Sequence, residues 1–224
     1  MRAKRPYHHA NLKQNLLDAA VDLLAEAGLH GFTLREVARR AGVSHNAPYR
    51  HFRDKDDLVA AVAAEGFDRL TESMKEAMAE GSSAAERLRL AGRGYVEFAV
   101  GSPRHLVVMF ETRSSLEQQA GEQQAGAQRA EYAVAGQRAF RVLLDAVSAV
   151  QAEGSLPKGD PHTFAVAAWA AVHGLAKLAV SGQLPFDAGQ AIRFTNYLTL
   201  AMLHGMENLP HPSDEALTKP VPVR

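Results

Sequence analysis

Helical segments separated by glycine and proline stops are the feature that most constrains how this chain can fold. Over residues 12–27, leucines and alanines recur at steps of three and four, and Gly28 follows where a left-handed helix-ending residue is expected. Comparable segments continue to about residue 207. Forty of the 224 residues are alanine, which favours helix because it loses no side-chain entropy and buries no polar group. The sequence therefore predicts an all-α protein of about nine helices.

Two short helices are expected directly after the first one. Thr33 and Glu36 have the spacing of a capping box, which begins a helix over residues 34–41. Gly42 suits a positive φ, and Ser44 suits the N-cap of a third helix that ends near residue 52. Two short helices joined by a tight glycine turn are typical of a helix-turn-helix, although bundles that bind no nucleic acid share this outline.

The third of these segments is unusually polar for a helix of about two turns. It contains side chains that can contact base edges or phosphates, namely His45, Asn46, Tyr49, Arg50 and His51. The whole chain has 25 basic and 25 acidic residues, but residues 1–60 contain ten Lys or Arg against seven Asp or Glu. A basic N-terminal part of this kind favours DNA binding.

Residues 32–58 resemble the DNA-binding signature of the tetracycline-repressor (TetR) family of bacterial transcription regulators. The match consists of T-x-x-x-V-A-x-x-A-G-V-S followed by Y-x-x-F-x-x-K-x-x-L. With the first helix it covers about residues 11–60. The resemblance implies a three-helix head joined by a long helix to a C-terminal helical bundle. It also implies a homodimer on a palindromic operator in double-stranded DNA, released when the bundle binds an unidentified small-molecule effector.

The resemblance also assigns residue roles within the head. The family's base-reading positions fall on Arg35, His45, Asn46 and Ala47, and its phosphate-contact positions on Thr33, Ser44, Tyr49, His51 and Lys55. The alternatives are a solvated first-turn arginine for Arg35 and a half-buried packing ring for Tyr49. Pro48 departs from the family, which usually has Leu or Ile there. Because proline lacks an N–H, it predicts that the third helix starts late or tightens into 3₁₀ geometry.

The remaining chain predicts a helical body. We expect helices over residues 55–79, 84–100, 104–112, 128–153, 161–180 and 188–207. Residues 113–127 show no amphipathic period and are either a polar connector or an extension of the helix that follows. The expected domains are a flexible basic arm (1–10), a DNA-binding head (11–57), an effector-binding and dimerisation domain (58–208) and a disordered tail (209–224).

The last two long helices are apolar around much of their circumference, so both sides need cover. We expect a two-fold dimer interface there, with a wholly intramolecular core as the alternative. The candidate interface residues are Ala167, Ala171, Gly174, Leu178, Phe194, Tyr197, Leu198, Ala201 and Met202.

The run from Trp169 to Gly174 resembles the Trp-His-Gly signature of one subgroup of TetR-type C-terminal domains. It suggests an effector pocket for a largely apolar ligand with one or two polar groups, with an ordinary aromatic core as the alternative. The candidate pocket residues are Tyr95, Phe98, Met109, Phe110, Phe140, Trp169 and His173.

Two other function classes compete with a ligand-responsive repressor. A constitutive DNA-binding protein would not require the long body. An enzyme is disfavoured because the sequence has no glycine-rich phosphate loop, metal-ligand histidine pair or nucleophile elbow, and no cysteine. We therefore predict no catalytic residue, metal or cofactor. The start lacks a signal-like apolar stretch, and the longest charge-poor stretch, 161–176, is short for a bilayer, so we expect a cytoplasmic protein without a membrane partner.

Overall fold

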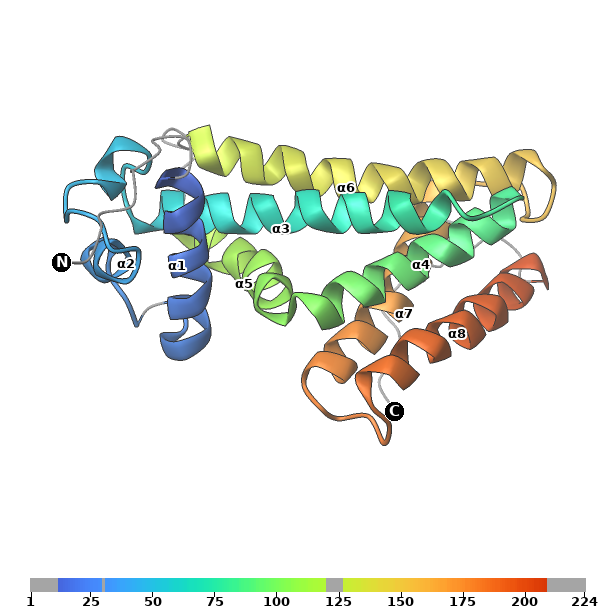
Figure 1. Cartoon of the computed structure of the whole chain (residues 1–224). Helices are drawn as coiled ribbons and strands as arrows, with labels where there is room; N and C mark the ends of the chain where they lie inside the picture. The colour runs from blue at the N-terminus through green and yellow to red at the C-terminus, as the bar shows by residue number, and fades with distance from the viewer. Residues whose placement is uncertain (1–11, 30, 120–126, 209–224) are drawn as a thin grey trace, which may run out of the picture. The chain divides into compact units, whose positions relative to one another are not determined.

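The computed structural model describes residues 12–29, 31–119 and 127–208 (Figure 1). Within these ranges the protein is all-α, as predicted, with eight α-helices, one short 3₁₀ helix and no strand. The elements are α1 (Leu12–Ala27), α2 (Leu34–Arg40), η2 (Pro48–Arg50), α3 (Lys55–Met78), α4 (Ala84–Gly101), α5 (Pro103–Gln119), α6 (Ala127–Ala152), α7 (Pro161–Val180) and α8 (Ala188–Asn208).

Glycines in the left-handed region end several helices where the sequence predicted an end. Gly28 has φ +69°, Gly154 φ +81° and Gly182 φ +66°. After α6, Ser155 N donates to Val150 O at 3.1 Å, and after α7, Gln183 N donates to Leu178 O at 3.0 Å. These bonds satisfy carbonyls that the helix end would leave unpaired, which fixes the end of each helix.

One expected helix is longer than predicted. The helix expected over residues 104–112 is the first part of α5, which continues to Gln119. Residues 113–119 therefore extend the preceding helix, and are neither a connector nor an extension of the following one. Their polar side chains give no apolar period, so periodicity could not reveal the helix. The rest of that segment, 120–126, the arm (1–10) and the tail (209–224) lie outside the described residues.

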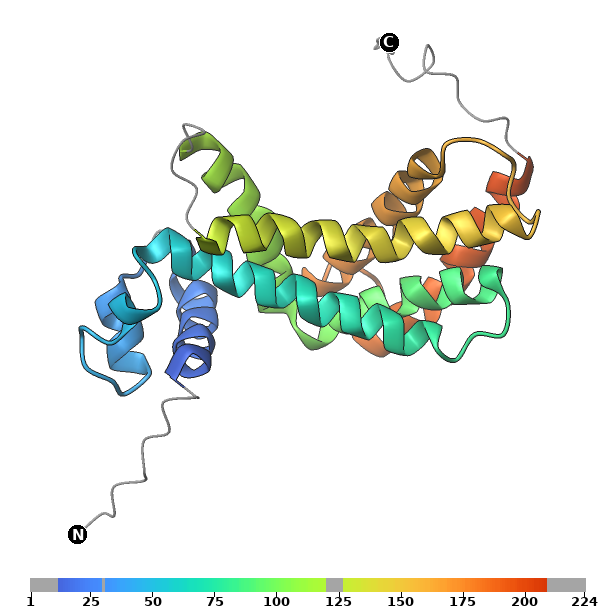
Figure 2. The same cartoon turned by 90° about the horizontal axis from the view of Figure 1, so that it is seen from above.

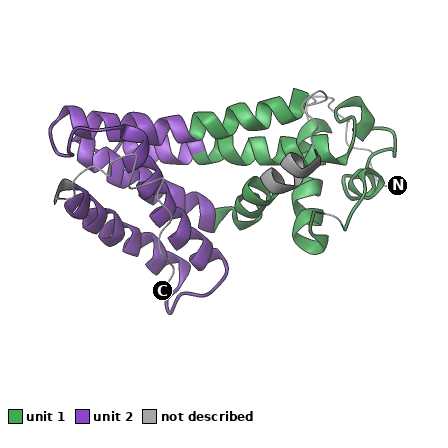
Figure 3. Cartoon of the chain, turned by 180° about the vertical axis from the view of Figure 1, so that it is seen from behind, with its two compact units in different colours: residues 1–70, 101–139 green, residues 71–100, 140–224 purple. Residues whose placement is uncertain are grey.

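The chain divides into two compact units (Figure 3). Unit 1 comprises residues 1–70 and 101–139, and unit 2 comprises residues 71–100 and 140–224. Unit 1 thus contains α5 and the first parts of α3 and α6 as well as the predicted head.

Unit 1 has a core built from α1, α2, the start of α3 and α5. Leu16, Val37, Phe52 and Leu58 in this core are almost completely buried. Within this unit α6 runs beside α3 (Figure 1, Figure 2), and the ring centroids of Phe67 and Tyr132 are 5.8 Å apart. The two short helices of the head are therefore fixed on a packed helical support.

Unit 2 is formed by α4, α7 and α8 with the later parts of α3 and α6. Its α3 and α4 segments cross very closely at Gly94, whose carbonyl accepts a 2.8 Å hydrogen bond from Ser73 Oγ. Helices α7 and α8 pack against each other. By length and composition alone, α7 would also qualify as a candidate membrane span, the one such helix among the described residues. A helix that packs in a soluble core or interface has the same composition.

Candidate DNA-binding and effector sites

The capping box predicted at the start of α2 is present. Thr33 N donates to Glu36 Oε2 at 2.8 Å, and Glu36 N donates to Thr33 Oγ1 at 3.3 Å. Gly42 has φ +68°, and Val43 N donates to Ala38 O at 2.9 Å. These contacts set the direction in which the chain leaves α2 and begins the polar segment.

The third predicted helix requires a correction. Residues 44–47 form a hydrogen-bonded turn, in which Ala47 N donates to Ser44 O at 2.9 Å, and only Pro48–Arg50 is helical, with 3₁₀ geometry. Pro48 has no N–H to donate to an intrahelical bond, so an α-helix starting at Ser44 would lack a bond in its first turn. The expected tightening into 3₁₀ geometry is therefore confirmed, whereas the α-helix is absent.

Three of the four predicted base-reading residues lie at the surface. Arg35, in the first turn of α2, is exposed, as are His45 and Asn46 in the turn. Ala47 differs, because its side chain is 7% exposed and packs in the unit 1 core. Arg35, His45 and Asn46 are thus exposed to solvent, whereas Ala47 packs into the core and stabilises the turn.

The predicted phosphate-contact residues divide into two groups. Thr33, Ser44 and Tyr49 are exposed, and the Tyr49 side chain is 53% exposed. His51 is half-buried beside the ring of Phe52. Lys55 Nζ donates to Leu29 O at 3.0 Å and lies 5.3 Å from the centroid of Phe32, so its side chain is already engaged within the head.

Unit 2 contains an apolar cavity. It has a volume of about 520 Å³, its open mouth included. Its lining residues come from all five helices of the unit: Met74, Leu88, Arg89, Ala91, Gly92, Tyr95, Leu143, Ala168, Trp169, Val172, Thr199, Met202, Leu203 and Met206. The three methionines are unbranched and adaptable, so the cavity can widen by side-chain rotation.

Tyr95 and Trp169, both predicted pocket residues, line the cavity and share a polar network with His173. Tyr95 Oη lies 2.7 Å from His173 Nδ1 and also forms a hydrogen bond with the Trp169 side chain. Because an indole N–H can only donate, Tyr95 accepts from Trp169, and the direction of its bond to His173 depends on the tautomer of the imidazole. Burial raises the pKa of Tyr95 well above its usual value, and burial and the charge of Lys177 lower the pKa of His173, so both groups are neutral at pH 7.

The other predicted pocket residues lie elsewhere. Phe140 packs against Trp169 with centroids 6.3 Å apart, and Phe98 is buried on α4, but neither lines the cavity. Met109 and Phe110 belong to unit 1, where Met109 packs on Gly66. Sequence reasoning missed the lining residues of α8 and the end of α3, and it assigned Met202 only to the dimer interface.

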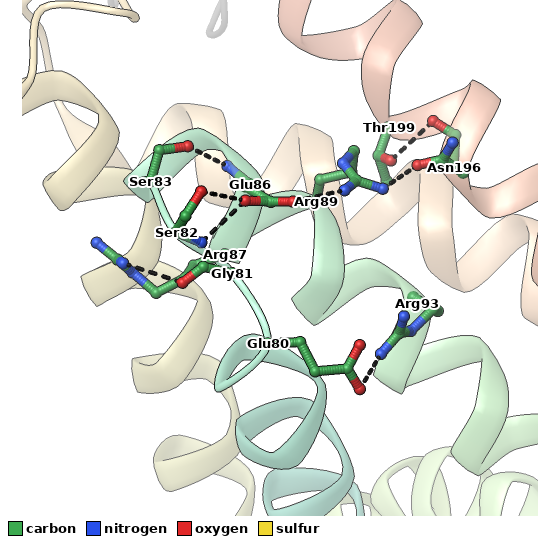
Figure 4. Close-up of polar contacts among 10 residues, drawn as sticks. All are labelled: Glu80, Gly81, Ser82, Ser83, Glu86, Arg87, Arg89, Arg93, Asn196 and Thr199. Atoms are coloured by element: carbon green, nitrogen blue, oxygen red, sulfur yellow. Dashed lines mark hydrogen bonds and ion pairs between the residues drawn. The ribbon is translucent and has the colours of Figure 1, made fainter.

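The one charged lining residue is Arg89 on α4. Its guanidinium contacts Asn196 Oδ1 on α8 through Nη1, and Nη2 lies 3.5 Å from Glu86 Oε1 (Figure 4). Glu86 also accepts hydrogen bonds from Ser82 N at 2.8 Å and Ser82 Oγ at 2.7 Å. Arg89 therefore connects α4 with α8 beside an otherwise apolar cavity.

Several predicted interface residues on α7 and α8 are exposed within the single chain. Leu178 is 41% exposed and Tyr197 67%, and the Phe194 ring lies tilted between those of Phe186 and Tyr197 with centroid distances of 5.5 and 5.6 Å. Ala167 and Ala201 are exposed as well, whereas the remaining candidates, Ala171, Gly174, Leu198 and Met202, are half-buried. Two residues outside the prediction, Val166 and Leu200, extend this exposed apolar face.

Comparison with known proteins gives two family matches. Residues 16–62 match the family described as bacterial regulatory proteins, tetR family, and residues 88–201 match the tetracyclin repressor-like C-terminal domain. The fatty acid metabolism regulator protein of Bacillus subtilis (strain 168) is 29% identical over 116 residues, which span 51% of this chain and 57% of that relative.

Two solved structures extend the similarity over most of the chain. A protein of unknown function from Rhodococcus sp. RHA1 has a TM-score of 0.72 at 32% identity, covering 92% of this chain and all of that one. The transcriptional regulator FadR from Bacillus subtilis, in complex with stearoyl-CoA, has a TM-score of 0.68 at 19% identity, covering 86% of this chain and 98% of that one.

Proposed function

The chain belongs to the tetR family of bacterial regulatory proteins, and we propose that it is a ligand-responsive repressor of transcription rather than an enzyme. In this proposal a cytoplasmic homodimer binds a palindromic operator, and a largely apolar small molecule releases it. No cofactor or metal takes part.

The observation that supports DNA binding most directly is the exposed polar turn after α2. His45 and Asn46 are exposed, while Ala47 and Pro48 beside them are buried and hold the turn to the core. An amide can pair bidentately with adenine, and the guanidinium of Arg35 with guanine. We assign base reading to these three exposed residues, and phosphate contact to Thr33, Ser44 and Tyr49 with smaller contributions from His51 and Lys55.

The apolar cavity in unit 2 supports an effector with a hydrocarbon part. FadR of Bacillus subtilis, which shares this fold, was solved with stearoyl-CoA. A hydrophobic cavity lined by adaptable methionines suits an acyl chain, because these side chains can rotate to admit it. A constitutive DNA-binding protein would need no such cavity.

Dimerisation is assigned to the exposed apolar face of α7 and α8. In this family arrangement the two heads enter successive major grooves, about 34 Å apart, and the effector favours a state with another separation. The ligand then weakens DNA binding by as much as it prefers that other state.

The DNA half of the proposal is tested by selecting duplexes from a random pool with the purified protein in moderate salt. We expect a palindromic site to be enriched. Asn46→Ala should then weaken binding to the operator by about 1–3 kcal/mol and binding to random DNA far less, because base contacts specify sequence. Tyr49→Phe should weaken both about equally. No enrichment of any sequence would refute the proposal, and equal losses with Asn46→Ala would refute its base-reading role.

A further inference from the structure

The interior of the cavity offers an effector almost no hydrogen-bonding group. Tyr95 forms hydrogen bonds with Trp169 and with His173 within the wall. The hydroxyl of Thr199 donates to Thr195 O at 2.8 Å, along its own helix. A polar ligand group placed in the interior would lose its water without gaining a partner, so the interior selects hydrocarbon.

Arg89 is the exception among the lining residues. Its side chain is 23% exposed, so it remains charged and reachable while most of its stem is covered. Its charge is only partly compensated, since Glu86 stands 3.5 Å away and is also bonded to Ser82. Its other contact is with the neutral amide oxygen of Asn196. An anion can displace this oxygen, because it accepts a stronger, charge-assisted hydrogen bond from the guanidinium.

From this arrangement we infer that Arg89 binds the anionic group of the effector, which is therefore an anionic amphiphile with its hydrocarbon chain in the cavity. The inference rests on the proposed function and adds the ligand's head-group chemistry to it. A carboxylate and a coenzyme A phosphate share this chemistry, and the experiment below separates them.

The same contact gives the effector a route to the dimer face. Arg89 lies on α4, and Asn196 lies on α8 between Phe194 and Tyr197. An anion that takes the guanidinium away from Asn196 removes a link between α4 and α8 (Figure 4). The helix that presents the exposed aromatic residues is thereby released from one of its polar tethers.

The native protein provides its own probe, because Trp169 is the single tryptophan of the chain and lines the cavity. Its fluorescence is titrated with four ligands, each at concentrations where it stays dissolved and does not aggregate: dodecanoate, dodecanoyl-CoA, dodecan-1-ol and coenzyme A. We expect at least one of the two anionic C12 ligands to have a Kd about tenfold or more below that of dodecan-1-ol. Coenzyme A alone should cause no change in the tryptophan fluorescence. The tighter of the two anionic ligands identifies the head group as carboxylate or phosphate.

Arg89→Gln should raise the Kd of the preferred anionic ligand about tenfold or more and leave that of dodecan-1-ol unchanged. Arg141→Gln, on the exposed side of α6, is the matched control and should change neither Kd. If Arg89→Gln does not fold, Arg89→Lys takes its place. Because lysine keeps the charge, it should raise the Kd of the anionic ligand less than Arg89→Gln would. The comparison of the four ligands on the wild-type protein tests the proposal without any variant.

The outcomes separate the two proposals. Equal affinity of wild-type protein for anionic and neutral C12 ligands, or equal losses of both with Arg89→Gln, overturns the role of Arg89 and leaves the apolar effector site in place. A tryptophan signal that responds to none of the chain-bearing ligands overturns both the site and the head-group assignment.

Discussion

At the residue scale, burial fixes the charge of a side chain more firmly than its type does. His105 on α5 is 7% exposed, and its Nε2 has no hydrogen-bond partner among the described residues. Burial, together with the nearby charge of Arg69 and against the opposing charge of Asp18, lowers its pKa from 6.5 to about 4. The imidazole is therefore neutral in the folded protein across the physiological range.

This histidine should make the protein less stable in mild acid. Between pH 7 and 5 the unfolded chain protonates His105 at its ordinary pKa of 6.5, whereas the folded chain resists protonation down to about 4. The unfolded state then binds more protons, so the free energy of unfolding falls as the pH falls, by about 1–2 kcal/mol from this group. Urea unfolding of wild type and His105→Leu at pH 7 and 5 measures this, and the variant should lose less stability on acidification. Identical losses would contradict it.

At the element scale, the close crossing of α3 and α4 depends on a single missing side chain. A Cβ on Gly94 of α4 would clash with the backbone carbonyl of Ser73 and stand 2.9 Å from Met74 Cα, both on α3. Backbone atoms cannot rotate away as a flexible side chain can. The approach of these two helices, which includes the Ser73–Gly94 hydrogen bond, therefore requires glycine.

Gly94→Ala should consequently lower the free energy of unfolding by about 1–3 kcal/mol, because the helices must separate or distort to admit the methyl group. Gly101→Ala in the same helix is the control, since nothing lies within 4 Å of its added Cβ. It should change stability by no more than about 1 kcal/mol, in the stabilising direction if the helix end is well formed. Denaturant unfolding compares the two variants, and similar effects from both would show that the crossing is not tight.

The elements that sequence predicted best are those whose ends have local chemical causes. The capping box at Thr33 and the glycine stops depend on residues within a few positions of each other, and they lie where predicted. The cavity depends instead on distant residues meeting in space. Sequence reasoning missed Met74 and assigned Met202 only to the dimer interface, because an apolar period cannot tell a cavity wall from a filled core or an interface. It also missed Arg89, because a charged residue on a helix is expected at the surface.

At the scale of the whole molecule, the exposed apolar face of α7 and α8 is the surface on which the proposed dimer would form. Phe194, Tyr197 and Leu178 leave a substantial aromatic and aliphatic surface in contact with water in the single chain. Surfaces of this kind are unfavourable in an isolated protein and typical of interfaces. The proposed DNA binding depends on this face, because two heads can match a palindrome only when a dimer holds them.

Tyr197→Glu should therefore convert the dimer to a monomer, because it places a charge at the interface, and should weaken operator binding in parallel. Val134→Glu, which alters an exposed apolar residue of α6, is the matched control and should leave the dimer intact. Sedimentation velocity and operator titration on the same samples provide the measurement. If the Tyr197→Glu protein sediments like wild type, the dimer interface does not lie on this face of α8.

The turn between α2 and η2 has a consequence for how such a protein can change its target. Ala47 and Pro48 supply the packing, while His45 and Asn46 point to solvent and contribute nothing to the core. In the proposed base-reading role of His45 and Asn46, substitutions at these two outer positions would exchange one recognised sequence for another at little cost to folding. A lineage, or an engineer, could redirect the regulator to new genes by editing two neighbouring codons while its response to the effector stays as it was.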